Sequence, residues 1–340
     1  MKFNFHAPIN MQTSYGLVAI NIATRVSCNI LPIGQVGQDV PKSLLDRVGN
    51  EKPFDLNLPT IKLWHQFDLA TIGRGKKIGY TFFELDRFNQ VEMAHLNSMD
   101  EVWVATEWAK QVLAANGVNR PAKVLPLGVD PKIFAPVNYK PDNYIFFSAG
   151  KWEIRKSQDE IVGAFNAGFT PANSVELWLS MHNQFHTLEF MTAKKKEYLA
   201  TPMGVAGKIK IVGPFNTQKD LARIMNMTSC GVFPSKAEGW GLETLEMMAC
   251  GKPVIVTDYA GHTEFCDKSN STLIPVDKLV PAYDGKWFFN QGNWGSFNQS
   301  DLIEAMRINF KAGNMINSSG INTAETYSWD NLGKNINDII

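Results

Sequence analysis

Two glutamates and two glycines in the stretch 234–258, PSKAEGWGLETLEMMACGKPVIVTD, have the spacing of a phosphate and hydroxyl site. Gly239 and Gly241 precede an expected helix, where glycine lets a bound group approach several backbone amides that cradle a phosphate. Glu238 lies in the loop and Glu246 eight positions later, on the helix. We expect Glu246 near the mouth of the same loop, where its carboxylate accepts hydrogen bonds from a diol such as ribose.

A basic cluster follows the apolar strand pattern YIFFSA. The stretch GKWEIRKS places Lys151, Arg155 and Lys156 within six residues of one another. Cations at the end of a strand can neutralise a diphosphate as negative charge develops on it, and each charge-assisted bond contributes about 1.5–3 kcal/mol. Arg155 either shares this role or is a surface charge beside Glu153.

The remaining reactive side chains do not predict a metal site. His182 and His186 have HxxxH spacing but no cysteine near them in the sequence, and we do not expect the histidines to hold a catalytic metal. Glu84 and Asp86 follow a strand pattern but do not form the Asp-x-Asp motif of metal-dependent transferases. We therefore assign them no metal or nucleophile role, and at most a position on the side of the site that binds the acceptor substrate. His65 also follows a strand, as either a substrate contact or a hydrogen-bonded structural residue.

Short apolar runs alternate with helical patterns along the chain, including helices expected at 157–166, 218–227 and 242–249, whereas 277–300 has no clear period. This alternation predicts an α/β fold with parallel sheets. With roughly 150 residues per domain, the turn-rich linker FAPVNYKPDN divides the chain into domains 1–137 and 142–325, with a terminal helix at 326–340. Ligands of such sheets bind at the carboxyl ends of the strands, where both clusters fall.

Composition limits the partners and the compartment. The 33 basic and 33 acidic residues cancel, so no global field draws the chain to nucleic acid or anionic lipid. Four scattered cysteines without CxxC spacing indicate neither a zinc site nor a disulfide framework, and fit a cytoplasmic protein. No window approaches about 18 uninterrupted apolar residues, so we expect no transmembrane segment.

The string EGWGLETLE, followed by ACGKPVIVTDYAGHTEF, closely resembles the Glu-x7-Glu signature of retaining GT-B glycosyltransferases of family 4, the glycosyl transferases group 1. The resemblance implies two Rossmann-like domains facing a central cleft, with a C-terminal helix that crosses back onto the N-terminal domain. It assigns the transferred sugar to Glu238 and the nucleoside ribose to Glu246. It also implies that the distal phosphate binds to the loop amides, those of Gly239, Trp240, Gly241 and Leu242.

Other stretches carry the resemblance further. Lys151 and Lys156 match the family's basic positions, although Lys151 stands where arginine is more usual and Ser157 where glycine is more usual. Gly16, after the first strand, resembles the glycine loop of the N-terminal domain. His262 stands where the family often has glycine, and is expected to line the sugar pocket.

The implied activity is that of a retaining hexosyltransferase, with same-face attack and no side-chain base. A nucleoside diphosphate sugar, UDP-glucose first, is the expected donor, without a permanent cofactor or metal. The expected acceptor is a glycan or small molecule, with a hydroxymethylated base in phage DNA as the alternative. A GT-B epimerase or phosphorylase and a non-catalytic nucleotide- or glycan-binding module stay open, whereas the absence of GxGxxG after the first strand argues against a dehydrogenase. The oligomeric state is not predicted.

Overall fold

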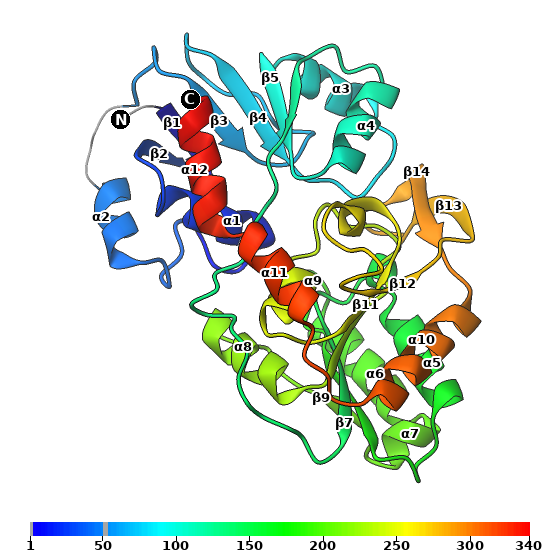
Figure 1. The fold of residues 1–340 in the computed structure, drawn as a ribbon. Helices are drawn as coiled ribbons and strands as arrows, with labels where there is room; N and C mark the ends of the chain where they lie inside the picture. The colour runs from blue at the N-terminus through cyan, green and yellow to red at the C-terminus, as the bar shows by residue number, and fades with distance from the viewer. Residues whose placement is uncertain (1–2, 50–53) are drawn as a thin grey trace. The chain divides into compact units, whose positions relative to one another are not determined.

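The protein is described by a computed structural model covering residues 3–49 and 54–340, and it divides into two compact units. The first comprises Met1–Gly128 and Tyr327–Ile340, and the second Val129–Thr326. Each unit contains its own sheet of six parallel strands, coloured blue to cyan and green to yellow in Figure 1. The expected α/β fold with two Rossmann-like parallel sheets is confirmed.

The sheet of the first unit has the order β2-β1-β3-β4-β5-β6. Its central strands are buried along their length, as strands covered on both faces must be. The strands are β1 (Phe3–Ala7), β2 (Cys28–Pro32), β3 (Thr60–Leu63), β4 (Lys77–Thr81), β5 (Glu101–Val104) and β6 (Ala122–Val124). The helices are α1 (Ser14–Ala23), α2 (Lys42–Gly49), α3 (Gln90–Asn97), α4 (Glu107–Ala115) and α12 (Trp329–Ile339).

The C-terminal helix α12 belongs to the first unit and lies beside α1 (Figure 1). It buries Trp329, Leu332 and Ile336 along one face. Asp330 pairs with Arg25 just beyond the end of α1, at 2.5 Å. The sequence prediction placed a helix in this terminal stretch, and the structure contains one.

The sheet of the second unit has the order β12-β11-β10-β7-β8-β9. Its strands are β7 (Tyr144–Ala149), β8 (Val175–Ser180), β9 (Ile209–Ile211), β10 (Cys230–Phe233), β11 (Val254–Thr257) and β12 (Thr272–Ile274). The helices and single turns are η1 (Ile154–Lys156), α5 (Gln158–Gly168), α6 (Leu188–Leu199), α7 (Pro202–Val205), α8 (Gln218–Met227), α9 (Leu242–Ala249), η2 (Ala260–Glu264), α10 (Gln299–Ala312) and α11 (Ser318–Thr326). A separate antiparallel hairpin joins β13 (Lys278–Tyr283) to β14 (Phe289–Ser296).

The structure differs from the sequence prediction in two places. The aperiodic stretch 277–300 is mostly the β13–β14 hairpin. The second unit begins at Val129, ahead of the expected linker, and linker residues 135 and 137 hydrogen-bond to Asn226 of α8. Among the described residues, no helix combines the length and apolar character needed to cross a membrane.

Candidate functional site

The strand order of the second unit has a switch point between β7 and β10. The chain runs outward from β7 to β8 and β9, then returns to the other side of β7 as β10. The carboxyl ends of β7 and β10 therefore flank a topological switch point, where open α/β sheets bind ligands. Residues 151–156 follow β7 and residues 234–246 follow β10, so the sheet brings the two predicted clusters together.

The loop after β10 leads into α9 through a glycine that no other residue replaces without strain. Gly241 is the N-cap of α9 with φ of 101°, and a Cβ there would lie 2.8 Å from the His262 ring. No side chain caps this helix. The first backbone amides of a helix lack partners within it. The amides of Leu242 and its neighbours at the start of α9 can therefore donate hydrogen bonds to an anion.

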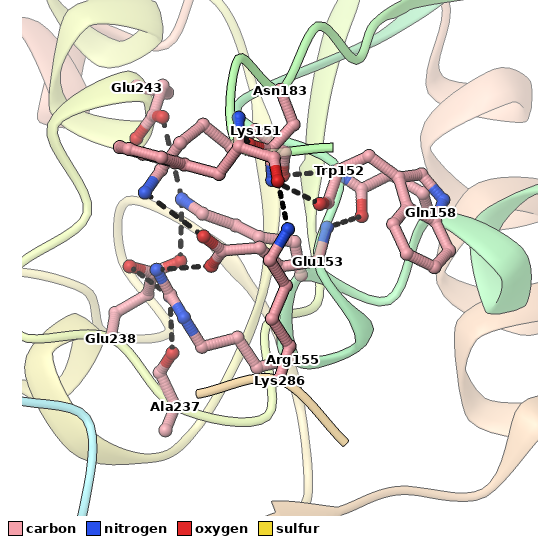
Figure 2. Close-up of polar contacts among 12 residues, drawn as sticks. Lys151, Trp152, Glu153, Arg155, Gln158, Asn183, Ala237, Glu238, Glu243 and Lys286 are labelled. Carbon is pink, nitrogen blue, oxygen red and sulfur yellow. Dashed lines mark hydrogen bonds and ion pairs between the residues drawn. The ribbon is translucent and has the colours of Figure 1, made fainter. Parts of the chain in front are cut away.

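Glu238 is held by two cations from the turn after β7 (Figure 2). Its carboxylate lies 3.0 Å from Arg155 Nη1 and 2.8 Å from Lys156 Nζ. The Ser235 hydroxyl donates a further bond of 2.8 Å to it. Because the Gly261 amide also bonds the Glu238 carbonyl at 2.9 Å, both the backbone and the side chain of this glutamate are fixed.

The ion pairs extend on both sides of Glu238. Arg155 Nη2 lies 2.8 Å from Glu153, whose other oxygen lies 3.0 Å from Lys151 Nζ. Lys156 Nζ lies 3.5 Å from Glu243 in the first turn of α9. Three cations thus alternate with three carboxylates in one network (Figure 2).

Two hydrogen bonds to backbone carbonyls join the turn after β7 to the loop after β10. The Lys236 amide donates to the Arg155 carbonyl at 2.7 Å, and Arg155 Nη1 donates to the Ala237 carbonyl at 3.1 Å. Arg155 is only 6% exposed, so its interpretation as a surface charge is wrong. It joins the turn after β7 to the loop after β10.

Burial and charge act in opposite directions on the network. Burial raises the pKa of Glu238, but Lys156 and Arg155 outweigh it, and its pKa falls well below the ordinary value. The pKa of Glu153 is lowered in the same way, against burial, mainly by Arg155. Burial opposes the charge of Lys156, whereas Glu238 and Glu243 raise its pKa above the ordinary value. All three groups are therefore charged at neutral pH, so Glu238 is suited to accept hydrogen bonds and not to transfer protons.

Glu246 lies on α9, after the loop that carries Glu238, and has the opposite environment. It is 4% exposed, and among the described residues no cation pairs with it. Burial, with a smaller effect of Glu243, raises its pKa well above the ordinary value. A buried carboxyl without a counter-charge is costly unless it is protonated or hydrogen-bonded, and a ligand hydroxyl supplies such a bond.

His262 lies against the start of α9 as a neutral ring. It is 1% exposed, and its Nε2 lies 3.3 Å from the Thr244 hydroxyl. Burial, assisted by the Lys156 charge, lowers its pKa to about 4. Its contact with Gly241 places it beside the loop, as packing for the glycine turn.

Ser157 and Gly16 both lie at positions where the local structure favours glycine. Ser157 has φ of 58°, a left-handed conformation that glycine adopts without strain. Gly16 lies in the first turn of α1, where a Cβ would meet the Asn10 carbonyl at 2.1 Å. Its amide bonds the Thr13 hydroxyl at 3.1 Å. Gly16 is in the first unit and the rest of the predicted site is in the second.

The structure adds residues that sequence reasoning missed. Glu153 and Glu243 complete the ion-pair network, and Ser235 orients Glu238. Their signal in the sequence is the alternation of charge in KWEIRK and the first glutamate of GLETLE, whose partners only the fold reveals. Among the described residues, no group of three or more histidines, cysteines or carboxylates is arranged to hold a metal ion.

Comparison with known sequences finds a family match within the second unit. A family model described as glycosyl transferases group 1 matches residues 174–284. A D-inositol 3-phosphate glycosyltransferase of Mycobacterium marinum is 27% identical over 137 residues, which are 39% of this chain and 25% of the relative. One from Jonesia denitrificans is 33% identical over 82 residues, 24% of this chain and 19% of the relative. The matches thus span a quarter or less of these two relatives.

Solved structures match nearly the whole chain. HepE (Alr3699) of Anabaena, in complex with UDP and glucose, has a TM-score of 0.73 at 15% identity, covering 100% of this chain and 99% of its own. A glycosyltransferase of Rickettsia africae has a TM-score of 0.71 at 14% identity, covering 99% and 97%. At this identity the likeness shows the fold, which is GT-B.

Proposed function

We propose that this GT-B protein, whose residues 174–284 match the glycosyl transferases group 1, transfers a sugar from a nucleoside diphosphate to an acceptor hydroxyl. The observation that carries the proposal is the Glu238 carboxylate, buried at a switch point between two cations and beside an uncapped helix. A sugar diphosphate needs both parts: an oxygen acceptor for its hydroxyls, and cations with amides for its phosphates.

The diphosphate would lie against the positive side of the network. An ammonium group has three N–H donors, and Lys156 directs contacts to Glu238 and Glu243, which leaves it a donor for a phosphate oxygen. The amides at the start of α9 add to this charge, with Gly239, Trp240, Gly241 and Leu242 lining the approach. Lys151, with a side chain 43% exposed, reaches the same phosphates from the rim. These groups stabilise the leaving diphosphate as it gains charge.

The two glutamates divide the remaining recognition. Glu238, ionised and fixed, accepts hydrogen bonds from the hydroxyls of the transferred sugar. Glu246, buried without a cation, accepts them from the ribose diol, which satisfies its carboxyl. Such a site uses no permanent cofactor and no metal. Transfer with retention follows when the acceptor attacks on the face from which the diphosphate leaves, and the leaving phosphate takes the proton.

UDP-glucose is the first donor to test, and the HepE structures, with UDP, glucose or UDP-glucose bound, support this choice. The acceptor we propose is a glycan or a small molecule. A hydroxymethylated base in DNA is the second candidate, and Arg74, Lys76 and Lys77 are the local basic cluster available to it in the first unit.

The test is consumption of UDP-, GDP-, ADP- and TDP-sugars in the presence of EDTA, followed by mass spectrometry of the released nucleotide. We expect one donor to be consumed, and proton NMR of the product to show the anomeric configuration of the donor. Inversion would contradict the same-face step. Activity that appears only when a divalent cation is restored would contradict the metal-free site. No consumption together with tight nucleotide binding would favour the non-catalytic module.

A further inference from the structure

The β13–β14 hairpin is fixed to the second unit by one face only. Trp294 is 2% exposed and Ala282 is fully buried on this inner face, and Phe288 packs on Trp294 with ring centroids 4.9 Å apart. The Gly295 amide donates to the carbonyl of Lys236, in the loop that carries Glu238, at 2.8 Å. The hairpin is therefore held directly beside the candidate site.

The outer face of the same hairpin exposes large aromatic rings. Tyr283 is 54% exposed, Trp287 56% and Phe289 62%, and Phe185, before α6, is 44% exposed. We call these four residues the hairpin patch. Single exposed apolar residues need no explanation, but a contiguous group of aromatic rings marks an interaction surface.

The four rings form two edge-to-face pairs. Phe185 and Trp287 have centroids 5.8 Å apart at 81°, and Tyr283 and Phe289, opposite each other in the strand register, lie 6.2 Å apart at 82°. Lys286 anchors the first pair, because its ammonium donates to the Phe185 carbonyl. Lys151 Nζ lies 5.2 Å from the Phe185 ring centroid, so the patch is continuous with the ion-pair network.

The two charged side chains at the tip of the hairpin, Asp284 and Lys286, form hydrogen bonds within the protein. One Asp284 carboxylate oxygen accepts the amides of residues 286, 287 and 288 at 2.7–2.9 Å. The Lys286 ammonium is directed to a backbone carbonyl. Asp284 and Lys286 carry opposite charges, so the surface offers a partner aromatic rings and not the dense positive charge that attracts a polyanion or an anionic membrane.

We propose that the hairpin patch binds a neutral glycan chain through stacking of sugar rings on its aromatic side chains. A pyranose ring has an apolar C–H face that fits the negative face of an aromatic ring, while its hydroxyls stay in water. This inference rests on the proposed function, because the bound chain is the acceptor, held beside the site at which its hydroxyl reacts. The patch would make a polymeric acceptor bind more tightly than a short one.

The experiment is native affinity electrophoresis of the full chain through gels containing dextran, soluble starch, xylan or galactomannan, with alginate as a charged polymer. We expect retardation by at least one neutral polysaccharide. The W287A/F289A double variant should bind that polymer about tenfold more weakly, since two aromatic contacts are lost. The matched control is Ile308→Ala, which removes an exposed apolar side chain, 51% exposed, from α10.

Three results would overturn the proposal: no retardation by any neutral polymer, retardation unchanged in W287A/F289A, or retardation by alginate alone. A dimer in size-exclusion chromatography that the double variant dissociates, without glycan binding, would instead make the patch an interface between copies. Circular dichroism and UDP binding of the variant show that it remains folded. A wild type that binds glycan but none of the UDP-, GDP-, ADP- and TDP-sugars would refute the proposed function and leave the patch in place.

Discussion

Glu238 and Glu246 show how two carboxyls on one loop and helix acquire opposite properties. Both are almost fully buried, and burial acts on each to raise its pKa. Glu238 has Arg155 and Lys156 within hydrogen-bond distance and stays ionised, whereas Glu246 has only the charge of Glu243 nearby. The difference gives the two residues opposite dependences of stability on pH.

Glu238→Gln should destabilise the protein at neutral pH by about 3–5 kcal/mol, because the buried cations Arg155 and Lys156 each lose one of their two carboxylate partners. The folded pKa of Glu238 lies below the unfolded value, so its contribution is present above about pH 4.5 and disappears as the pH falls towards the folded pKa. Thermal unfolding at several pH values measures this. A difference between wild type and variant that grows on acidification would contradict the ion-pair assignment.

Glu246→Gln should have the opposite effect in the absence of nucleotide. The folded pKa of Glu246 is raised, so above the ordinary value of 4.5 the unfolded wild type releases a proton that the folded wild type retains. Wild-type stability therefore falls, relative to the variant, as the pH rises from that value towards the folded pKa. The variant should unfold at a higher temperature than wild type at neutral pH. A less stable variant there would show that the carboxyl is charged and paired.

Lys156→Ala should mainly slow transfer. Removing one preorganised donor from a developing charge typically lowers kcat about 100-fold or more, and we expect that loss with the donor saturating. Lys210→Ala is the control, since it breaks an ion pair with Glu176 on the neighbouring strand β8. Turnover of Lys156→Ala close to wild type would remove Lys156 from the catalytic set.

At the scale of elements, α9 depends on the turn at its start. Gly241→Ala should lose stability twice, through the positive φ and through the contact with His262. Gly117→Ala separates the two effects, because Gly117 also has a positive φ, of 77°, but nothing lies within 4 Å of its Cβ direction. We expect the alanine at 241 to cost more and to weaken donor binding. Calorimetric unfolding measures both variants. Equal losses in the free energy of unfolding for Gly241→Ala and Gly117→Ala would contradict a tightly packed loop.

Elements with a strong period could be predicted from the sequence, and those set by tertiary contacts could not. Helices α8 and α9 have the bounds expected from the pattern, because amphipathic spacing and flanking turn residues define them locally. The β13–β14 hairpin was missed because its outer face is aromatic as well, so the usual apolar and polar alternation is absent. In the site, the motif identified Glu238 and Lys156, but the burial of Arg155 and its bridge to Glu153 required the fold.

At the scale of the whole molecule, the first unit contains both the first and the last residues of the chain. Residues 327–340 follow the second unit in the sequence but belong to the first. Gly333 lets α12 approach closely, since a Cβ there would lie 2.8 Å from the Cβ of Arg25. Leu332, 2% exposed, belongs to the buried face of α12.

Leu332→Ala should therefore destabilise the first unit by about 2–5 kcal/mol, the usual range for truncating a buried leucine. Nucleotide binding, which we assign to the second unit, should be unchanged at temperatures where the variant is folded. Differential scanning calorimetry with a nucleotide titration measures both quantities, and Lys334→Ala on the exposed face of α12 is the control. A variant as stable as wild type would show that α12 contributes little.

The central claim is that residues 151–156 and 234–246 form a donor site for a nucleoside diphosphate sugar. Calorimetric titration of the wild type and Glu246→Ala with UDP-glucose, and then with GDP-, ADP- and TDP-sugars, in the presence of EDTA tests it most directly. We predict selective binding of one donor, weakened about tenfold in Glu246→Ala, since each hydrogen bond between the uncharged carboxyl and the ribose diol contributes about 0.5–1.5 kcal/mol. Binding of no donor, or equal affinity in the wild type and Glu246→Ala, would contradict it.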